Sequence, residues 1–467
     1  MLRRLQYFLI LCFLWAFAAA GEGEGDRTEP RGDTPPPEEA AAEFGPDVQF
    51  LDLQWVLERV EQANLEVLLN REGMEAAIQR IYSERAGLFP TLDLRVGQSR
   101  SQFVNVGRGF DLPGTDPVSP PSNRFDARLE GNYSLIDTDR IAAFRSAKLG
   151  LELTEFQYES LLQDVMAAAV NTYLDHLRNL STMEVIQANI ERNASLLKLA
   201  RDRLNSGVAT QIDVTRAEVA LARSEQNSLE QETVILESEL RLKQILDLDL
   251  DTEITLDPIR DRLEEAPEMT EAVDLETLLE NRAEYQGEQV QLERQILARN
   301  AAIWQRFPQI SLFGNWGYVS DEAFSGQYEE AWAMGLQFSV PIFEGFSIRS
   351  DRLIAESNIR EQELVIRQLE QQLGSEYRLQ LQQVRSTFDQ IKVAKKSRDL
   401  GMDEFRLATR RFEQGVADNT EVVDAQRNLA EAENNYIVAL YRYGLARLNL
   451  ARTLGDVRKI LEVANEP

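Results

Sequence analysis

An internal duplication constrains the fold of this chain more than any other feature of its sequence. Residues 203–227, RLNSGVATQIDVTRAEVALARSEQN, match residues 411–435, RFEQGVADNTEVVDAQRNLAEAENN, at a constant offset of 208. The identical pairs are Arg203/Arg411, Gly207/Gly415, Val208/Val416, Ala209/Ala417, Val214/Val422, Ala217/Ala425, Leu221/Leu429 and Ala222/Ala430. Residues 51–246 and 274–456 are therefore two copies of one unit, which we expect to pack together as repeats do. An acidic connector, 247–273, joins them, and a tail, 457–467, follows.

Each copy contains a pair of segments in which apolar and polar residues alternate. The segments lie at about 90–98 and 125–135 in the first copy and about 308–319 and 331–341 in the second. A period of two predicts strands with one apolar and one polar side. The apolar sides carry the aromatic residues Phe125, Tyr133, Trp316, Tyr318, Trp332 and Phe338.

Strands of this kind fit two architectures. In a soluble sandwich the apolar side packs on a second sheet, whereas in an outer-membrane barrel it faces lipid. The length and aromatic content of the strands favour the barrel. Four strands cannot close a membrane barrel, because the smallest have about eight. Several chains must then share one barrel: two chains give eight strands, and three give twelve with room for a pore.

Long helices make up the rest of each copy. The segments 138–205 and 345–414 each lack proline and predict rods about 100 Å long. Shorter helices follow at 211–246 and 418–455. In the last helix a heptad seam runs through Val422, Ala425, Leu429, Ala432, Tyr436, Ala439, Tyr443, Ala446 and Leu450, and a weaker seam lies one residue along. Two seams predict a neighbour on each side, as in a helical tube. On the helices alone an ordinary antiparallel bundle fits equally well, and the strands favour the tube.

The N-terminus predicts export. Residues 1–20 combine Arg3 and Arg4, an apolar stretch and three closing alanines, which is the pattern of a cleaved signal peptide. An uncleaved anchor is the alternative, but Leu5 to Ala20 is shorter than the ~20 residues that a spanning helix needs. Residues 21–50, rich in Gly, Pro and Glu, are expected to form a disordered acidic leader, a solvated tether rather than a partner-binding segment.

Composition excludes several classes of function. The chain has 50 basic and 78 acidic side chains and a net charge of -28, which disfavours nucleic-acid binding. Its single histidine, His176, and single cysteine, Cys12, leave no material for a His- or Cys-based metal site or a disulfide framework. We therefore expect no metal and no cofactor, and only carboxylate chemistry or none.

A tight turn joins the two long helices in each copy. Gly207 and Gly415 supply the left-handed residue that ends a helix. Thr210 with Asp213, and Asp418 with Glu421, fit a capping arrangement at the start of the next helix. Asp424 lies one turn beyond Glu421 on the same helix face. If that face lines a narrowed tube, the copies form an acidic, cation-attracting ring; a solvated charge pair, or a hydrolase built on Asp213 or Asp424, are the alternatives.

Taken together, these motifs resemble the outer-membrane efflux protein (TolC) family. The resemblance rests on the duplicated strand-plus-helix unit, the Gly-Val-x-x-x-x-[Asp/Glu]-Val turn, and the segments VPIFEGFSIRSDRLIAESNI and NNYIVALYRYGLARLNLARTLG. It implies a mainly α fold with a membrane β-barrel: a homotrimer whose shared twelve-stranded barrel sits on a long periplasmic α-helical barrel. It also implies an equatorial layer that would include the connector 247–273.

The resemblance also implies roles for residues at the turns. The gate carboxylates match Glu421, Asp424 and Asp213, and a gate aromatic matches Phe412. Ala417 occupies a position that is basic in some members, where Arg216 or Arg411 could substitute. The tips, which would contact a periplasmic adaptor protein, comprise Gly207, Val208, Ala209, Gly415, Val416 and Ala417.

The expected function follows from this resemblance. We expect a non-enzymatic exit duct in the outer membrane, working in tripartite efflux or type I secretion with an adaptor and an inner-membrane pump of the RND, ABC or MFS type. Its partners would be two further copies of the chain, the adaptor, the pump and outer-membrane lipid, but not nucleic acid. A periplasmic coiled-coil adaptor is the alternative.

Overall fold

A computed structural model describes residues 48–102, 120–258, 263, 273–323 and 326–462. The strands are β1 (Val48–Leu51), β2 (Thr91–Ser101), β3 (Ser122–Ile136), β4 (Glu253–Leu256), β5 (Gln309–Ser320) and β6 (Glu329–Ser339). The helices are α2 (Leu53–Ala63), α3 (Leu65–Ala86), α4 (Thr138–Asn205), α5 (Gln211–Ile245), α7 (Leu275–Glu280), α8 (Ala283–Trp304), α9 (Ser347–Glu413), α10 (Asn419–Thr453) and α11 (Lys459–Glu462). The expected signal peptide and nearly all of the acidic leader lie outside the described residues.

A four-stranded antiparallel sheet combines the two copies. Its order is β2-β3-β5-β6, so the hairpin of each copy contributes one half and β3 pairs with β5 at the junction. The register aligns Leu94, Leu129, Trp316 and Trp332 in one row across the sheet. All six aromatic residues expected on the apolar side share this side of the sheet. Strands β2 and β6 each have a free edge within the described part of the chain.

The last strand ends earlier than its pattern predicts. Alternation continues to Val340 and Pro341, but β6 ends at Ser339. Proline has no backbone N–H to donate to a strand partner. Beyond it the chain turns sharply, with Gly345 and Phe346 both in the left-handed region at φ values of 61° and 71°, and α9 then begins.

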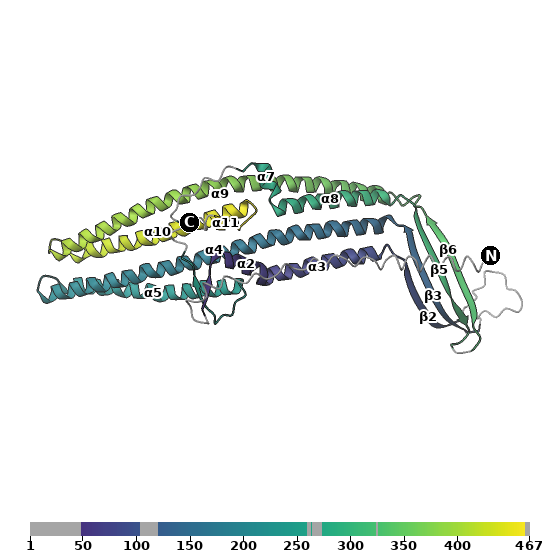
Figure 1. The fold of residues 1–467 in the computed structure, drawn as a ribbon, viewed down its shortest axis with the longest axis horizontal. Coiled ribbons are helices and arrows are strands. Elements are labelled where there is room, and N and C mark those ends of the chain that lie inside the picture. The colour runs from purple at the N-terminus through teal and green to yellow at the C-terminus, as the bar shows by residue number, and fades with distance from the viewer. Residues whose placement is uncertain (1–47, 103–119, 259–262, 264–272, 324–325, 463–467) are drawn as a thin grey trace, which may run out of the picture. The chain divides into compact units, whose positions relative to one another are not determined.

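Each long helix packs against one short helix near the sheet and another at the far end. Figure 1 shows α4 beside α3 and then α5, and α9 beside α8 and then α10, so the two copies repeat one arrangement. The copies meet where α4 contacts α8 and α10. The lateral order is thus α3, α4, α8, α9 near the sheet and α5, α4, α10, α9 beyond it, which parallels the strand order.

The two seams of α10 are buried. Every member of the heptad seam from Val422 to Leu450 is buried, and so are Ile437, Leu440, Gly444 and Ala451 of the second seam. One helix neighbour is α9 of the same copy and the other is α4 of the first copy. The tyrosines Tyr173, Tyr436 and Tyr443 are among the largest fully buried side chains here. This core holds the two copies together.

The outer helices of the layer carry exposed apolar stripes. On α9, Val393, Leu400 and Leu407 are one heptad apart and 59–70% exposed. On α5, Ile212 and Val219 form one such pair, and Leu229 and Leu236 form another. Heptad spacing of apolar residues is typical of a helix that packs on a partner helix. Both stripes lie at the lateral edges of the layer.

Among the described helices, none is both long enough and apolar enough to cross a membrane.

Candidate functional site

The turns at the far end of the helices have closely similar geometry. Gly207 and Gly415 have φ values of 75° and 76°. After each glycine, a backbone N–H reaches back across the turn: Val208 N donates to Arg203 O and Val416 N donates to Arg411 O, both at 3.0 Å. This is the Schellman arrangement in which a left-handed glycine ends a helix. Val208 and Val416 then lie exposed at the tips.

The caps that follow the turns differ between the copies. Asp213 Oδ2 accepts from the hydroxyl of Thr210 at 2.7 Å and from its backbone N–H at 2.9 Å. The Thr210 hydroxyl bond, with the N–H bond beside it, holds the pKa of Asp213 below its usual value. In the second copy Asp418 caps the helix, accepting from the N–H groups of Thr420 and Glu421. Asp213 therefore has a structural role within its own turn.

The two remaining acids each have an arginine partner. Glu421 lies 3.4 Å from Arg411 and Asp424 lies 3.0 Å from Arg427. All four side chains are at least 40% exposed, so these pairs add little to stability. Within one chain the structure does not bring Asp213, Glu421 and Asp424 together as one cluster.

Three polar contacts connect the turns of the two copies. Arg203 Nη1 donates to the carbonyl oxygen of Phe412, and its guanidinium lies over the Phe412 ring, 4.5 Å from the centroid. Asn419 Nδ2 donates to Asp213 O at 2.6 Å. Arg216 Nη1 donates to Thr420 Oγ1 at 2.8 Å. These contacts fix one helical hairpin against the other.

The two arginines that could substitute at the position of Ala417 make different contacts within one chain. Arg216 does connect the copies, whereas Arg411 pairs with Glu421 inside the second copy. The sequence reasoning missed Arg203 and Asn419. Arg203 and Arg411 are an identical pair in the duplication, so the repeat drew attention to Arg203. It did not indicate that Arg203, and not Arg411, contacts the other copy.

Phe412 belongs to a small apolar core behind the turns. It is 2% exposed, and its cluster also contains Leu196, Leu197, Ala200, Val214, Ala217, Ala408, Val422 and Ala425. An aromatic side chain at this position therefore anchors the hairpins, and the Arg203 guanidinium lies over its ring.

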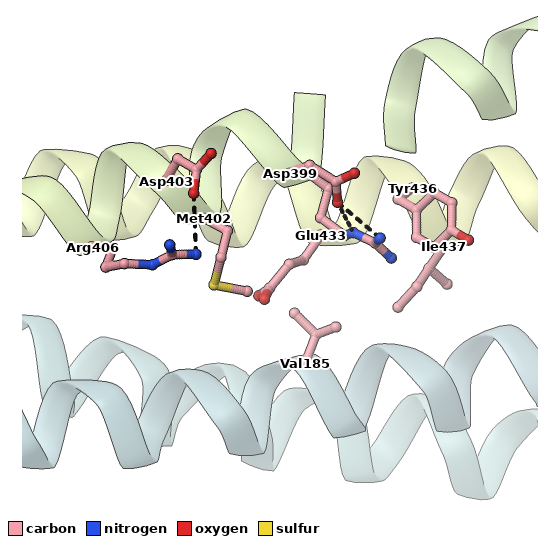
Figure 2. Close-up of a pocket in the computed structure, with 9 residues that line it drawn as sticks. Val185, Asp399, Met402, Asp403, Arg406, Glu433, Tyr436 and Ile437 are labelled. Atoms are coloured by element: carbon pink, nitrogen blue, oxygen red, sulfur yellow. Dashed lines mark hydrogen bonds and ion pairs between the residues drawn. The ribbon is translucent and has the colours of Figure 1, made fainter. Parts of the chain in front are cut away.

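A groove lies farther along the junction of the copies. It has a volume of about 460 Å³ and is lined by Val185 of α4 and by residues of α9 and α10. Figure 2 shows Arg406 paired with Asp403 on its α9 side. On the same helix Arg398 pairs with Asp399. The Arg398 guanidinium covers the ring of Tyr436 at 4.4 Å. Nearby, the ion pair of Arg192 and Glu433 joins α4 to α10 at 2.6 Å.

His176 is buried at the centre of the helical layer. Its Nδ1 lies 2.8 Å from Ser238 Oγ, and burial lowers the pKa of the imidazole. Over the described residues, no three His, Cys, Asp or Glu side chains are grouped so that they could hold a metal ion.

Comparison with known proteins gives a consistent result. The family model described as "Outer membrane efflux protein" matches residues 56–247 and 275–456. A probable efflux pump outer membrane protein, TtgC of Pseudomonas putida, is 24% identical over 89% of this chain and 86% of its own length. The outer membrane protein TolC of Escherichia coli is 22% identical over 88% of this chain and 83% of its own. The CmeC outer membrane channel of Campylobacter jejuni superposes with a TM-score of 0.72 and 19% identity, covering 88% of this chain and 89% of that one.

Proposed function

The chain belongs to the outer membrane efflux protein family, and we propose that three copies of it form one passive exit duct through the outer membrane. Members of this family are outer-membrane efflux channels, with helices that extend into the periplasm. For this chain we further propose how many chains form the duct, how the barrel closes and which residues control passage.

Closure by several chains is supported by the free edges of the fold. Strands β2 and β6 are the two edges of one sheet, and α5 and α9 are the two edges of the helical layer. Because the two edges differ, one edge of each chain can pair with the opposite edge of the next chain, and such head-to-tail contacts form a ring where the rotation between chains closes. The exposed heptad stripes on α5 and α9 supply matching apolar surfaces. Three chains give twelve strands, which leaves room for a pore.

Insertion in the membrane is supported by the apolar side of the sheet. Trp332, Leu336 and Phe338 are more than half exposed on the side that carries the aromatic residues. A surface of this size without a protein cover fits lipid. The same surface disfavours the alternative of a soluble periplasmic adaptor, which would have no use for it.

Control of passage is assigned to the turns. In a trimer, Glu421 and Asp424 of three chains would converge near the periplasmic end and form an acidic ring that attracts cations. The contacts that Arg203, Asn419 and Arg216 make between copies would hold the hairpins in the closed position. The hydrolase alternative, built on Asp213 or Asp424, lacks support, because Asp213 accepts hydrogen bonds from Thr210 in its own turn and Asp424 pairs with Arg427.

Partners are inferred from the relatives. TtgC is named as a component of an efflux pump. By analogy this duct would receive cargo from an inner-membrane pump through a periplasmic adaptor, which would contact the exposed tips around Val208 and Val416. The pump, not the duct, would then select the cargo.

Planar-bilayer recording tests the proposed function. Trimers of the unchanged protein should conduct, prefer cations and be blocked by divalent cations. The double variant Glu421→Gln/Asp424→Asn should lose the cation preference and the block. Glu431→Gln, which neutralises an exposed acid farther along α10, is the matched control and should behave as the unchanged protein. Failure of the unchanged protein to form pores would refute the duct, and unchanged selectivity in the double variant would refute the acidic ring.

A further inference from the structure

The side of the sheet opposite the aromatic residues carries ordered rows of charge. The register places Asp93 directly opposite Glu130, and two residues along each strand it places Arg95 opposite Arg128. Asp126 and Arg124 follow on the same side of β3. Successive rows are therefore acidic, basic, acidic and basic, from the helical end of the sheet outward.

This arrangement works against the stability of the sheet. Like charges directly opposite each other on antiparallel strands are destabilising, and the first two rows both have them. Two ion pairs offset part of this effect: Arg95 lies 3.3 Å from Glu130, diagonally across the strand pair, and Arg128 lies 3.5 Å from Asp126, its neighbour on the same side of β3. The side chains of Asp126, Arg128 and Glu130 are each about a quarter exposed, whereas that of Arg95 on the edge strand is 70% exposed. Acidic and basic rows alternate on this side of β2 and β3, so the charges of these two strands nearly balance.

The duplication shows that the fold does not need these charges. Phe89-Pro90 and Phe307-Pro308 align the start of β2 with the start of β5, so Asp93 corresponds to Ser311 and Arg95 to Phe313. The same rows continue onto the second copy as Asn315 with Ala333, and Gly317 with Ala331. On this side of the second copy's hairpin the residues are neutral except Glu329, which lies in the row of Asp126. The charges of the first copy call for an explanation other than folding.

We propose that these rows form a charge-balanced filter on the pore wall of the exit barrel. This inference rests on the proposed trimer, in which the aromatic side faces lipid and the charged side faces water. In three chains, Asp93 and Glu130 would form a ring of six acids, and Arg95 and Arg128 would form an adjacent ring of six arginines. Rows on one side of a strand are about 7 Å apart, which is below the Debye length of about 8 Å at physiological ionic strength.

The electric field of each ring therefore extends to the neighbouring ring. At a distance the fields of these two rings cancel, so together they add no net ion preference to that of the periplasmic end. Charged groups on a passing molecule would meet both signs in turn, and neither cations nor anions would accumulate on the wall. Removing the charges of one sign should leave the field of the opposite charges uncompensated.

Reversal potentials of trimers in a salt gradient test the filter. The variant Arg95→Gln/Arg128→Gln should raise the ratio of cation to anion permeability several-fold, and Asp93→Asn/Glu130→Gln should lower it. Both shifts should shrink in about 1 M salt, where the Debye length falls to about 3 Å. Arg100→Gln is the matched control, because Arg100 lies on β2 but on the side that carries the aromatic residues. It should leave the ratio unchanged.

The outcomes separate this inference from the proposed function. Conducting variants whose permeability ratio equals that of the unchanged protein at low salt would overturn the filter and leave the duct intact. Absence of pores in the unchanged protein would instead refute the duct itself. If the double variants fail to assemble, Arg95→Gln alone decides, because this arginine is 70% exposed on an edge strand and its loss should not prevent folding. An unchanged ratio in that variant would also overturn the filter.

Discussion

Arg203 shows how a single residue connects the two copies at the tip. Its guanidinium donates to the Phe412 carbonyl and covers the Phe412 ring, so one side chain combines a charge-assisted hydrogen bond with a cation–π contact. Arg411, its counterpart in the duplication, forms an exposed ion pair inside its own copy. Residues that are identical in the two repeats therefore make different contacts.

Replacing Arg203 should favour the open state of the duct. Arg203→Gln removes a hydrogen bond from a charged donor, which contributes about 1.5–3 kcal/mol. A difference of that size changes a closed–open equilibrium by roughly tenfold or more. Single-channel recording should show a corresponding rise in open probability or conductance. Arg201→Gln is the control, because Arg201 pairs only with Glu218 at an exposed site of its own hairpin; an equal effect in both variants would argue against the bridging role.

At the scale of elements, local pattern explains most of what is observed. The long helix α4 begins and ends at the residues where its sequence pattern does, because Asp137 caps its start and Gly207 follows its end. Helix α10 buries both seams because α9 and α4 cover two of its faces. Strand β6 departs from its pattern because Pro341 cannot continue the hydrogen-bonding ladder.

The turn glycine should be sensitive to substitution for conformational reasons alone. A Cβ at Gly207 would meet no atom within 4 Å, but the residue has a φ of 75°, which disfavours any L side chain. Gly207→Ala should therefore lower stability by about 1–2 kcal/mol. Gly150→Ala, in open space within α4, should raise it by about 1 kcal/mol instead. Thermal melting of the purified protein would compare the two; a neutral Gly207→Ala would mean that the turn can change its conformation.

For the whole molecule, the unpaired edges determine what one chain can do alone. Over the described residues, two strand edges and two apolar helix stripes are uncovered in one chain, and in the proposed trimer the neighbouring chains would cover them. The folded state and the assembled state are then closely coupled.

A charge on the α9 stripe should prevent assembly. Leu400→Asp places a carboxylate on a surface that would be buried against a neighbouring chain, where an unpaired charge is strongly destabilising. The trimer band on a semi-native gel should be lost or should melt at a lower temperature. Lys395→Asp introduces the same side chain on the same helix but off the stripe, and should retain the trimer. Equal trimer stability in both variants would show that the stripe is not an interface.

The sequence by itself determined the duplication, the positions of the strands and long helices, the apolar side of the sheet and the glycine turns. These features follow from local periodicity and backbone preference, which are visible within each segment. The tertiary structure decided which residues of one copy touch the other: Arg203 rather than Arg411 at the tip, Asn419 against Asp213, and Asp93 beside Glu130 on the sheet. Such contacts depend on the stagger and rotation with which hairpins pack and on strand register. These quantities cannot be read from the sequence periodicity of a single segment.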